Sequence, residues 1–438
     1  MKKDWLLRRL FLSLLCVLSI FLLTACYEGG QGEILSKDTL RQNLSEASED
    51  HAFVFEYLDE WDFPLFGTSK IKRIETLYKK YYYKDLPSDR EHATLTAEYF
   101  IENYYDRIDL TDKNSVTEAL ISSYVEAVGD DYSYYRSPDE YESYSESMSG
   151  SFVGIGITVS KANEGRELLV IEVTTTTAAD AGILADDRIV AVDGATVAEL
   201  GYTEAVKRVK GEEGTSVTLT VIRGSDELTI TVPRVKITEN TVEYSITDGI
   251  GYVKISGFKS NTDEQFRDAV AALIEADVKG VVYDLRSNTG GYLASVENML
   301  DRLAPKGTEL VSFTHGYADP YLAKTAESFI LPSVVLCNGR TASAAELFTA
   351  GVRDLCKSSG TPVAIVGVGT FGKGVMQRTY TLSDGSAVTF TVAYYNPPSG
   401  ENYDGVGITP DQEVILTENG DSQLDAAMAK IVEIVNNY

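Results

Sequence analysis

The stretch SVVLCNGRTASAAE, residues 333–346, combines a strand pattern, a turn and the start of a helix. Residues 333–337 are an apolar run, the turn contains Gly339, and an apolar helical spacing begins at Ala344. We expect a buried strand that turns directly into a helix, with Ser343 at the junction. The free N–H groups and partial positive charge of a helix N-terminus favour a developing oxyanion. Taken alone, Ser343 is more typical of an ordinary N-cap serine.

A second stretch, FGKGVMQ at residues 371–377, places Lys373 between two glycines. Glycines cost about 1 kcal/mol each in a helix but allow other backbone to approach closely, so helix propensity does not explain this lysine. The alternative is a surface lysine in a turn. A lysine acts as a base at neutral pH when apolar surroundings disfavour its charged form, and Val366, Phe371 and Met376 are apolar neighbours. The pair Ser343 and Lys373 therefore predicts a serine hydrolase with lysine as its base.

Gln377 follows Lys373 by four residues, which places both on the same side of a bent strand or of a helical turn. An uncharged amide at this position is suited to hold the amine without protonating it. We therefore predict that Gln377 positions Lys373.

Histidine is scarce, since the chain contains only His51, His92 and His315. His315 keeps a histidine-based triad open, but no acidic residue near it marks an orienting partner. Scattered histidines without paired Cys or His spacing offer no metal ligand set. We expect neither a metal ion nor another cofactor.

Five groups of motifs resemble, in the same order, those of the C-terminal processing peptidases, also called tail-specific proteases. They are GDDYSYY at 129–135 with GSFVGIG at 150–156, DLRSNTGG at 284–291, NGRTASAAE at 338–346, FGKGVMQ at 371–377 and DGVGITP at 404–410. The resemblance extends from about residue 93 to the end of the chain. Thr341 and Ala345 stand where the family often has serines.

The resemblance implies the same roles as the residues themselves: Ser343 as nucleophile, Lys373 as general base and Gln377 as the group that positions the lysine. It also implies an oxyanion hole made by backbone N–H groups of Ala344 and of Gly290 or Gly291. The implied fold is α+β, with a crotonase-like α/β protease core, N-terminal helices and an inserted PDZ domain.

Residues 154–234 follow a pattern of short alternating strands, with a helix at 202–210 stopped by Gly211. Within it, GIL at 182–184 and DRIVAVDG at 187–194 resemble a PDZ domain. Such a domain captures an extended peptide by strand addition and holds its terminal carboxylate on backbone N–H groups. The peptide-binding loop is predicted to contain Val153, Gly154, Ile155 and Gly156. The expected partners are protein or peptide substrates that dock by their C-terminal tails.

The domain boundaries expected from these patterns are an N-terminal helical region at 51–149, a PDZ domain at 150–236 and a serine protease core at 237–438. After residue 238 apolar strands alternate with helices, which is typical of an α/β core. The strands are expected at 252–255, 281–285, 334–337 and 364–366, and the first helix at about 262–276 with Thr262 as its N-cap. Residues 379–395 are expected to form a hairpin that turns at 383–386. Residues 52–85 are rich in aromatic side chains and fit either core or a self-association surface. The sequence therefore leaves open whether the protein forms a homodimer.

Residues 1–25 have the basic start and apolar run of a lipoprotein signal peptide, and LTAC at 23–26 is a cleavage box that ends in cysteine. The apolar run is shorter than the roughly 20 residues of a transmembrane helix. We expect cleavage before Cys26 and lipidation of its thiol. Residues 26–50, which are polar, would then tether the protein to the outer face of a bacterial membrane.

The formal net charge of −27 disfavours nucleic-acid binding, which depends on basic patches. Of the four cysteines, Cys337 and Cys356 lie outside the signal and lipidation segment. An oxidising compartment permits a disulfide between them. Cys337 sits in a buried-strand pattern, so we expect two separate core thiols instead.

The leading hypothesis is an endopeptidase for exported proteins that cleaves at Ser343. A surface scaffold that binds peptide tails without cleaving them is the alternative from another class, supported by the PDZ pattern. A crotonase-like enzyme acting on thioesters is weaker, because such enzymes rarely carry a PDZ domain or an export signal.

Overall fold

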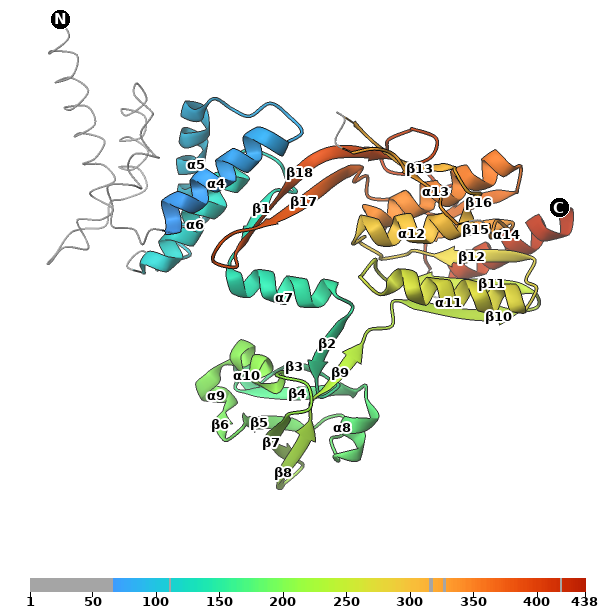
Figure 1. The fold of residues 1–438 in the computed structure, drawn as a ribbon. Coiled ribbons are helices and arrows are strands. Elements are labelled where there is room, and N and C mark those ends of the chain that lie inside the picture. Colours follow the sequence, from blue (N-terminus) through green and yellow to red (C-terminus); the bar gives the residue numbers. More distant parts are fainter. Residues whose placement is uncertain (1–65, 110–111, 315–317, 326–327, 418–419) are drawn as a thin grey trace, which may run out of the picture. The chain divides into compact units, whose positions relative to one another are not determined.

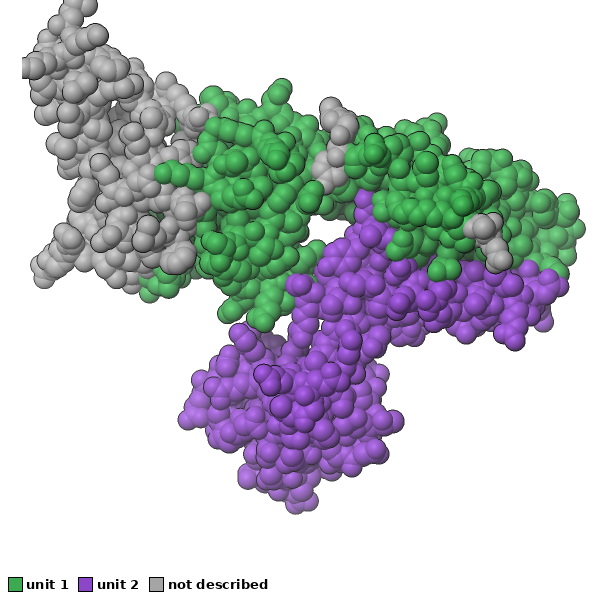
Figure 2. Space-filling model, viewed as in Figure 1, with its two compact units in different colours: residues 1–144, 279–290, 297–438 green, residues 145–278, 291–296 purple. Residues whose placement is uncertain are grey.

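The computed structural model describes residues 66–109, 112–314, 318–325, 328–417 and 420–438. The chain divides into two compact units, which Figure 2 shows in different colours. Among the described residues, unit 1 comprises those within 66–144, 279–290 and 297–438, and unit 2 comprises residues 145–278 and 291–296. The predicted signal peptide (1–25), tether (26–50) and lipidation site Cys26 lie outside the described residues.

Unit 1 contains a parallel arrangement of four strands, in the order β12, β15, β16, β19, of which Figure 1 labels the first three. The strands are β12 (Gly280–Asp284), β15 (Ser333–Cys337), β16 (Val363–Gly367) and β19 (Gln412–Glu413). Every residue of β12 and β15 is buried, as expected for strands covered on both faces. Helices α13 (Ala344–Ser359) and α14 (Ser422–Asn437) pack against these strands. The predicted alternation of strands and helices is confirmed, and the crotonase-like character of the core stays a prediction.

A long antiparallel hairpin joins this part of unit 1 to the N-terminal helices, and Figure 1 shows it as an extended ribbon. Its strands are β17 (Val375–Thr381) and β18 (Ala387–Asn396), so the turn falls where the sequence predicts it. Strand β18 also pairs with β1 (Tyr134–Arg136) and β13 (Glu309–Phe313). The N-terminal helices are α4 (Phe66–Tyr81), α5 (Asp89–Asn103) and α6 (Lys113–Glu126).

Aromatic side chains hold the hairpin against helix α4. The rings of Tyr78 and Phe390 stack with centroids 4.5 Å apart, and those of Tyr81 and Tyr380 stack at 5.4 Å. Tyr78 is 1% exposed. The sequence leaves open whether the aromatic segment belongs to the core or to a self-association surface. In its described part, residues 66–85, these side chains contribute to the core.

Unit 2 contains a five-strand antiparallel arrangement, in the order β3, β4, β5, β7, β8. Its strands are β3 (Ile157–Ala162), β4 (Glu167–Val173), β5 (Arg188–Val192), β7 (Ser216–Arg223) and β8 (Asp226–Pro233). Leu168, Val170 and Ile189 are fully buried in its core. The predicted helix at 202–210 is α10 (Tyr202–Val209). Two further strands, β2 (Ser151–Gly154) and β9 (Val235–Thr238), pair with each other.

Unit 2 also holds the hairpin of β10 (Val242–Thr247) and β11 (Ile250–Ile255), followed by helix α11 (Thr262–Glu275). The sequence predicts Thr262 as the N-cap of this helix, and that prediction is wrong by one residue. Asn261 is the N-cap, while the buried Thr262 hydroxyl oxygen accepts a hydrogen bond from the Lys259 N–H at 2.9 Å.

Within the described ranges, no helix is both long and apolar enough to cross a membrane. The same residues contain no group of three or more His, Cys, Asp or Glu side chains placed to hold a metal ion.

Candidate functional site

Ser343 lies between the buried strand β15 and the first residue of helix α13, as the sequence predicts. Its backbone angles are φ 57° and ψ −121°, a strained conformation for a residue other than glycine. The preceding turn is fixed by Thr341, whose hydroxyl accepts from the Asn338 N–H at 3.0 Å and donates to the Leu285 carbonyl at 2.9 Å. Strain retained in a well-bonded turn is typical of functional positions.

Glu346, in the first turn of α13, connects the Ser343 segment to the Lys373 segment. It is 0% exposed. One carboxylate oxygen accepts from the backbone N–H of Ser343 and from that of Lys373, each at 2.8 Å. The other accepts from the Gly372 N–H and from the Thr370 hydroxyl, each at 2.6 Å. The sequence motifs predict no role for Glu346, although a glutamate in a buried apolar helix is itself a signal, because a buried charge needs partners.

Lys373 lies in the loop between β16 and β17 and is half-buried. Burial lowers the pKa of Lys373 to about 8, although the negative charges of Asp130, Asp404 and Glu346 act in the opposite direction. The amine lies over the ring of Tyr132, 4.2 Å from the centroid. A pKa near neutrality is what the chemistry of a lysine base requires.

Gln377 lies on β17, where its side-chain amide donates to the Val375 carbonyl at 3.3 Å and to the Thr391 hydroxyl at 3.1 Å. Among the described residues, neither Gln377 nor the Ser343 hydroxyl makes a hydrogen bond to the Lys373 amine. The predicted roles of the three residues stay predictions.

Two tyrosines for which the sequence motifs predict no role adjoin the nucleophile candidate. The Tyr395 hydroxyl donates to the Lys373 carbonyl at 3.0 Å and lies 3.5 Å from the Ser343 hydroxyl oxygen. The Tyr403 ring packs edge-on against Tyr395 with centroids 6.2 Å apart. Burial raises the pKa of Tyr395, so its phenol stays protonated at neutral pH.

The backbone N–H groups predicted to bind the oxyanion belong to Ala344 and to Gly290 or Gly291, and their surroundings differ. Ala344 begins α13, and the first N–H groups of a helix have no partner inside it. Gly290 has φ 102°, and a Cβ there would lie 2.9 Å from both the Ala342 carbonyl oxygen and the Ser343 Cβ. Its N–H donates to the Asn288 side chain at 2.9 Å. Because this N–H already donates to Asn288, it is less suited to bind an oxyanion.

Gly291, the other candidate, belongs to unit 2. Its φ is 146°, and a Cβ there would lie 2.1 Å from the Phe258 carbonyl oxygen. The close packing of the two backbone segments therefore requires glycine.

The four residues of the predicted PDZ loop differ in their surroundings. Val153 and Gly154 end strand β2, and the Ile155 side chain is 1% exposed in the core of unit 2. Gly156 has φ 76°, and a Cβ there would lie 2.2 Å from the Thr175 side chain. Any contact that Ile155 makes with a peptide therefore involves its backbone.

Cys337 and Cys356 are separate buried thiols, as predicted. Burial raises the pKa of Cys337 to about 12 and that of Cys356 to about 11. Neither thiol has the depressed pKa of a nucleophile. His92 is buried among the N-terminal helices, where its ring stacks on Tyr124 at 4.1 Å. His51 and His315 lie outside the described residues.

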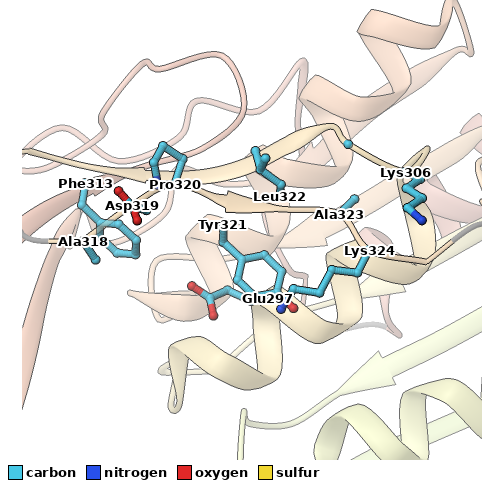
Figure 3. A pocket seen from close by; sticks show the side chains of 11 residues that line it. Glu297, Lys306, Phe313, Ala318, Asp319, Pro320, Tyr321, Leu322, Ala323 and Lys324 are labelled. Atoms are coloured by element: carbon cyan, nitrogen blue, oxygen red, sulfur yellow. The ribbon is translucent and has the colours of Figure 1, made fainter.

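A pocket of about 710 Å³ lies elsewhere in unit 1 (Figure 3). Side chains from α12 (Leu293–Leu303), β13 and the segment around β14 (Tyr321–Leu322) line it. Its lining contains none of the predicted catalytic residues. Burial raises the pKa of Glu297 at this pocket, while Lys324 opposes the shift. Chemistry and geometry at Ser343 favour that residue over the pocket as the candidate site.

Comparisons with known proteins agree with the motifs. A family model described as Peptidase family S41 matches residues 249–414, and a PDZ domain model matches residues 153–233. A CtpA-like serine protease of Staphylococcus haemolyticus (strain JCSC1435) is 33% identical over 353 residues, covering 80% of this chain and 66% of that protein. One of Staphylococcus aureus (strain COL) is 32% identical over 367 residues, covering 81% and 73%. The chain thus spans about two thirds of the length of these relatives.

Among solved structures, a photosystem II D1 C-terminal processing protease is similar to this chain with a TM-score of 0.45 and 25% sequence identity. The match covers 82% of this chain and 95% of that chain.

Proposed function

Because this chain belongs to peptidase family S41 and carries a PDZ domain, we propose that it is a serine endopeptidase in which Ser343 is the nucleophile and Lys373 the general base. The family model and the relatives confirm the family that the sequence motifs predict. One observation supports the assignment of residues above all others. The buried carboxylate of Glu346 binds the backbone N–H groups of both Ser343 and Lys373, so the two residues belong to one connected site.

In the proposed reaction, the neutral Lys373 amine takes the proton of the Ser343 hydroxyl while the oxygen attacks the substrate carbonyl. The tetrahedral oxyanion is stabilised by the Ala344 N–H at the helix N-terminus, together with an N–H of the Gly290–Gly291 turn. The lysine then gives its proton to the leaving amine as the peptide bond breaks. A water molecule gives a proton to the same amine and attacks the acyl-enzyme carbonyl. As the acyl–oxygen bond breaks, the ammonium returns that proton to the Ser343 oxygen, which restores the serine and the neutral amine. In the described residues the Lys373 amine lies over the Tyr132 ring and makes no hydrogen bond to the Ser343 hydroxyl, so attack requires the side chain to turn toward that hydroxyl.

The proposed substrates are exported proteins whose C-terminal tails dock on the PDZ domain by strand addition. The PDZ match at residues 153–233 supports tail recognition. The pattern of residues 1–26 supports lipidation at Cys26 and a location on the outer face of a bacterial membrane. Gln377 is proposed to hold the amine once Lys373 turns toward Ser343.

The test compares purified wild type with Ser343→Ala and Lys373→Ala on an unfolded protein substrate, with cleavage followed by mass spectrometry. Ser358→Ala and Lys357→Ala are matched controls, because both side chains are exposed at the end of α13. We expect loss of cleavage in the two site variants alone. Normal tail binding without cleavage, and without labelling of Ser343 by a serine-reactive phosphonate, would instead identify a peptide-binding scaffold.

Membrane attachment is tested separately. A Cys26→Ala protein should appear in the soluble fraction, whereas wild type should stay with the membranes after a high-salt wash. A Cys26→Ala protein that remains membrane-bound contradicts lipid anchoring at this residue.

A further inference from the structure

The Tyr132 ring lies against the Lys373 amine, with the nitrogen 4.2 Å from the ring centroid. Tyr132 lies in a turn just before β1 and is half-buried. The Asp130 carboxylate holds this turn by accepting from the Tyr132 N–H at 3.3 Å and from the Ser133 hydroxyl at 2.6 Å. The ring is therefore presented to the lysine by a fixed segment of backbone.

Charged groups around the lysine are engaged by other donors. Besides Asp130, the Asp404 carboxylate accepts from the Gly374 N–H at 2.9 Å, and Glu346 accepts from the backbone of Ser343, Gly372 and Lys373. In the described part of the chain, the Lys373 amine forms no ion pair with any of these three carboxylates. They act on it through their charge, and the aromatic face is what it contacts.

An aromatic face attracts an ammonium ion and has little attraction for a neutral amine. The ring therefore stabilises the charged form of Lys373 in its present position. Loss of the proton removes that attraction and leaves the amine free to turn toward Ser343. We propose that Tyr132 is a positioning residue for Lys373, whose ring holds the ammonium form out of hydrogen-bond contact with Ser343 and releases the neutral amine to it. This inference rests on the proposed function of Lys373 as the base.

The size of the effect follows from the pKa. With a pKa of about 8, roughly a tenth of Lys373 is neutral at pH 7. Loss of a partly buried cation–π contact is expected to lower the pKa by about half a unit to one unit. The neutral fraction at pH 7 would then rise about three- to fivefold.

The experiment measures the protonation of Lys373 without relying on peptidase activity. The full-length Ser343→Ala protein is labelled with acetic anhydride at a series of pH values, and acetylation of Lys373 is quantified by peptide mass spectrometry. Tyr132→Leu and Tyr132→Met remove the ring, and Tyr132→Phe keeps it. Tyr134→Leu is the matched control, because the Tyr134 ring faces the Arg136 guanidinium at 4.1 Å.

We expect the two ring-free variants to shift the labelling midpoint down by about half a unit to one unit, with three- to fivefold faster labelling at pH 7. Tyr132→Phe and Tyr134→Leu should keep the wild-type midpoint. An unchanged midpoint in both ring-free variants overturns the inference, and so does an equal shift in Tyr132→Phe, which would assign the effect to the hydroxyl.

A second measurement separates this inference from the proposed function. In protein with Ser343 intact, the acid limb of kcat/KM against pH should move with the labelling midpoint when Tyr132 is replaced by leucine. A labelling shift in a protein that cleaves nothing supports the ring–amine contact and refutes the peptidase. Unchanged midpoints in an active peptidase refute the contact and leave the peptidase standing.

Discussion

Glu346→Gln tests whether one buried carboxylate holds the nucleophile and the base in register. In wild type, one oxygen accepts from two backbone N–H groups, those of Ser343 and Lys373. The other accepts from the Gly372 N–H and the Thr370 hydroxyl. Glutamine preserves the shape but replaces one oxygen with an NH₂ group. Either orientation of the amide therefore turns a donor toward at least one backbone N–H.

The magnitude follows from the number of donors that lose their acceptor. A buried donor without an acceptor costs about 1–3 kcal/mol, so one or two lost bonds cost about 1–6 kcal/mol. The Lys373 loop is expected to shift to relieve this cost. A displacement of about 1 Å at a catalytic group costs on the order of a hundredfold in rate. We therefore expect kcat to fall about a hundredfold, with a smaller change in KM.

The assay combines steady-state kinetics with hydrogen–deuterium exchange of peptides that cover residues 341–347 and 368–375. Both peptides should exchange faster in Glu346→Gln. Glu413→Gln, at an exposed glutamate of β19, is the matched control and should leave both measurements unchanged. Wild-type kcat together with wild-type protection of both peptides in Glu346→Gln would refute the reasoning.

Three further changes have outcomes that the structure specifies. Lys373→Met should raise the free energy of unfolding at pH 7, because burial lowers the folded-state pKa of the lysine from 10.5 to about 8 and so penalises its charged form. The gain should shrink as pH rises from about 8 toward 10.5, where the folded wild type has lost this proton and the unfolded chain still holds it. Urea unfolding at several pH values measures both effects. Gly290→Ala should abolish most peptidase activity, because its Cβ would lie 2.9 Å from a backbone carbonyl oxygen, whereas Gly307→Ala, with φ 86° and open space, should stay active. Arg223→Met should cost about 3 kcal/mol of PDZ stability in urea unfolding, because it leaves the buried Asp187 carboxylate without its ion pair. Burial alone would raise the pKa of Asp187, but the Arg223 hydrogen bonds lower it below its ordinary value. Wild type should therefore lose the stability that this ion pair contributes as pH falls through the depressed pKa, and Arg223→Met should show no such loss.

Local patterns in the sequence were sufficient for much of the fold. Apolar runs predicted the buried strands β12 and β15, and the change of period after Cys337 placed Ser343 at a strand-to-helix junction. Alternating strands between residues 154 and 234 predicted the arrangement in unit 2. The error at Thr262 is of a different kind, because a threonine that accepts a bond within its turn resembles a cap in sequence.

The main strands and helices and the candidates Ser343, Lys373 and Gln377 could be predicted from the chain's residues, because the periods of strands and helices and the demands of glycine turns are local properties. The surroundings of the lysine could not. Tyr132 and Lys373 are far apart in the chain, and no periodicity relates them, yet their side chains meet. The bridge through Glu346 and the engagement of Gln377 by Thr391 likewise depend on which loops pack together. Such contacts set the charge and position of an amine, and they arise when distant segments exclude water from one another.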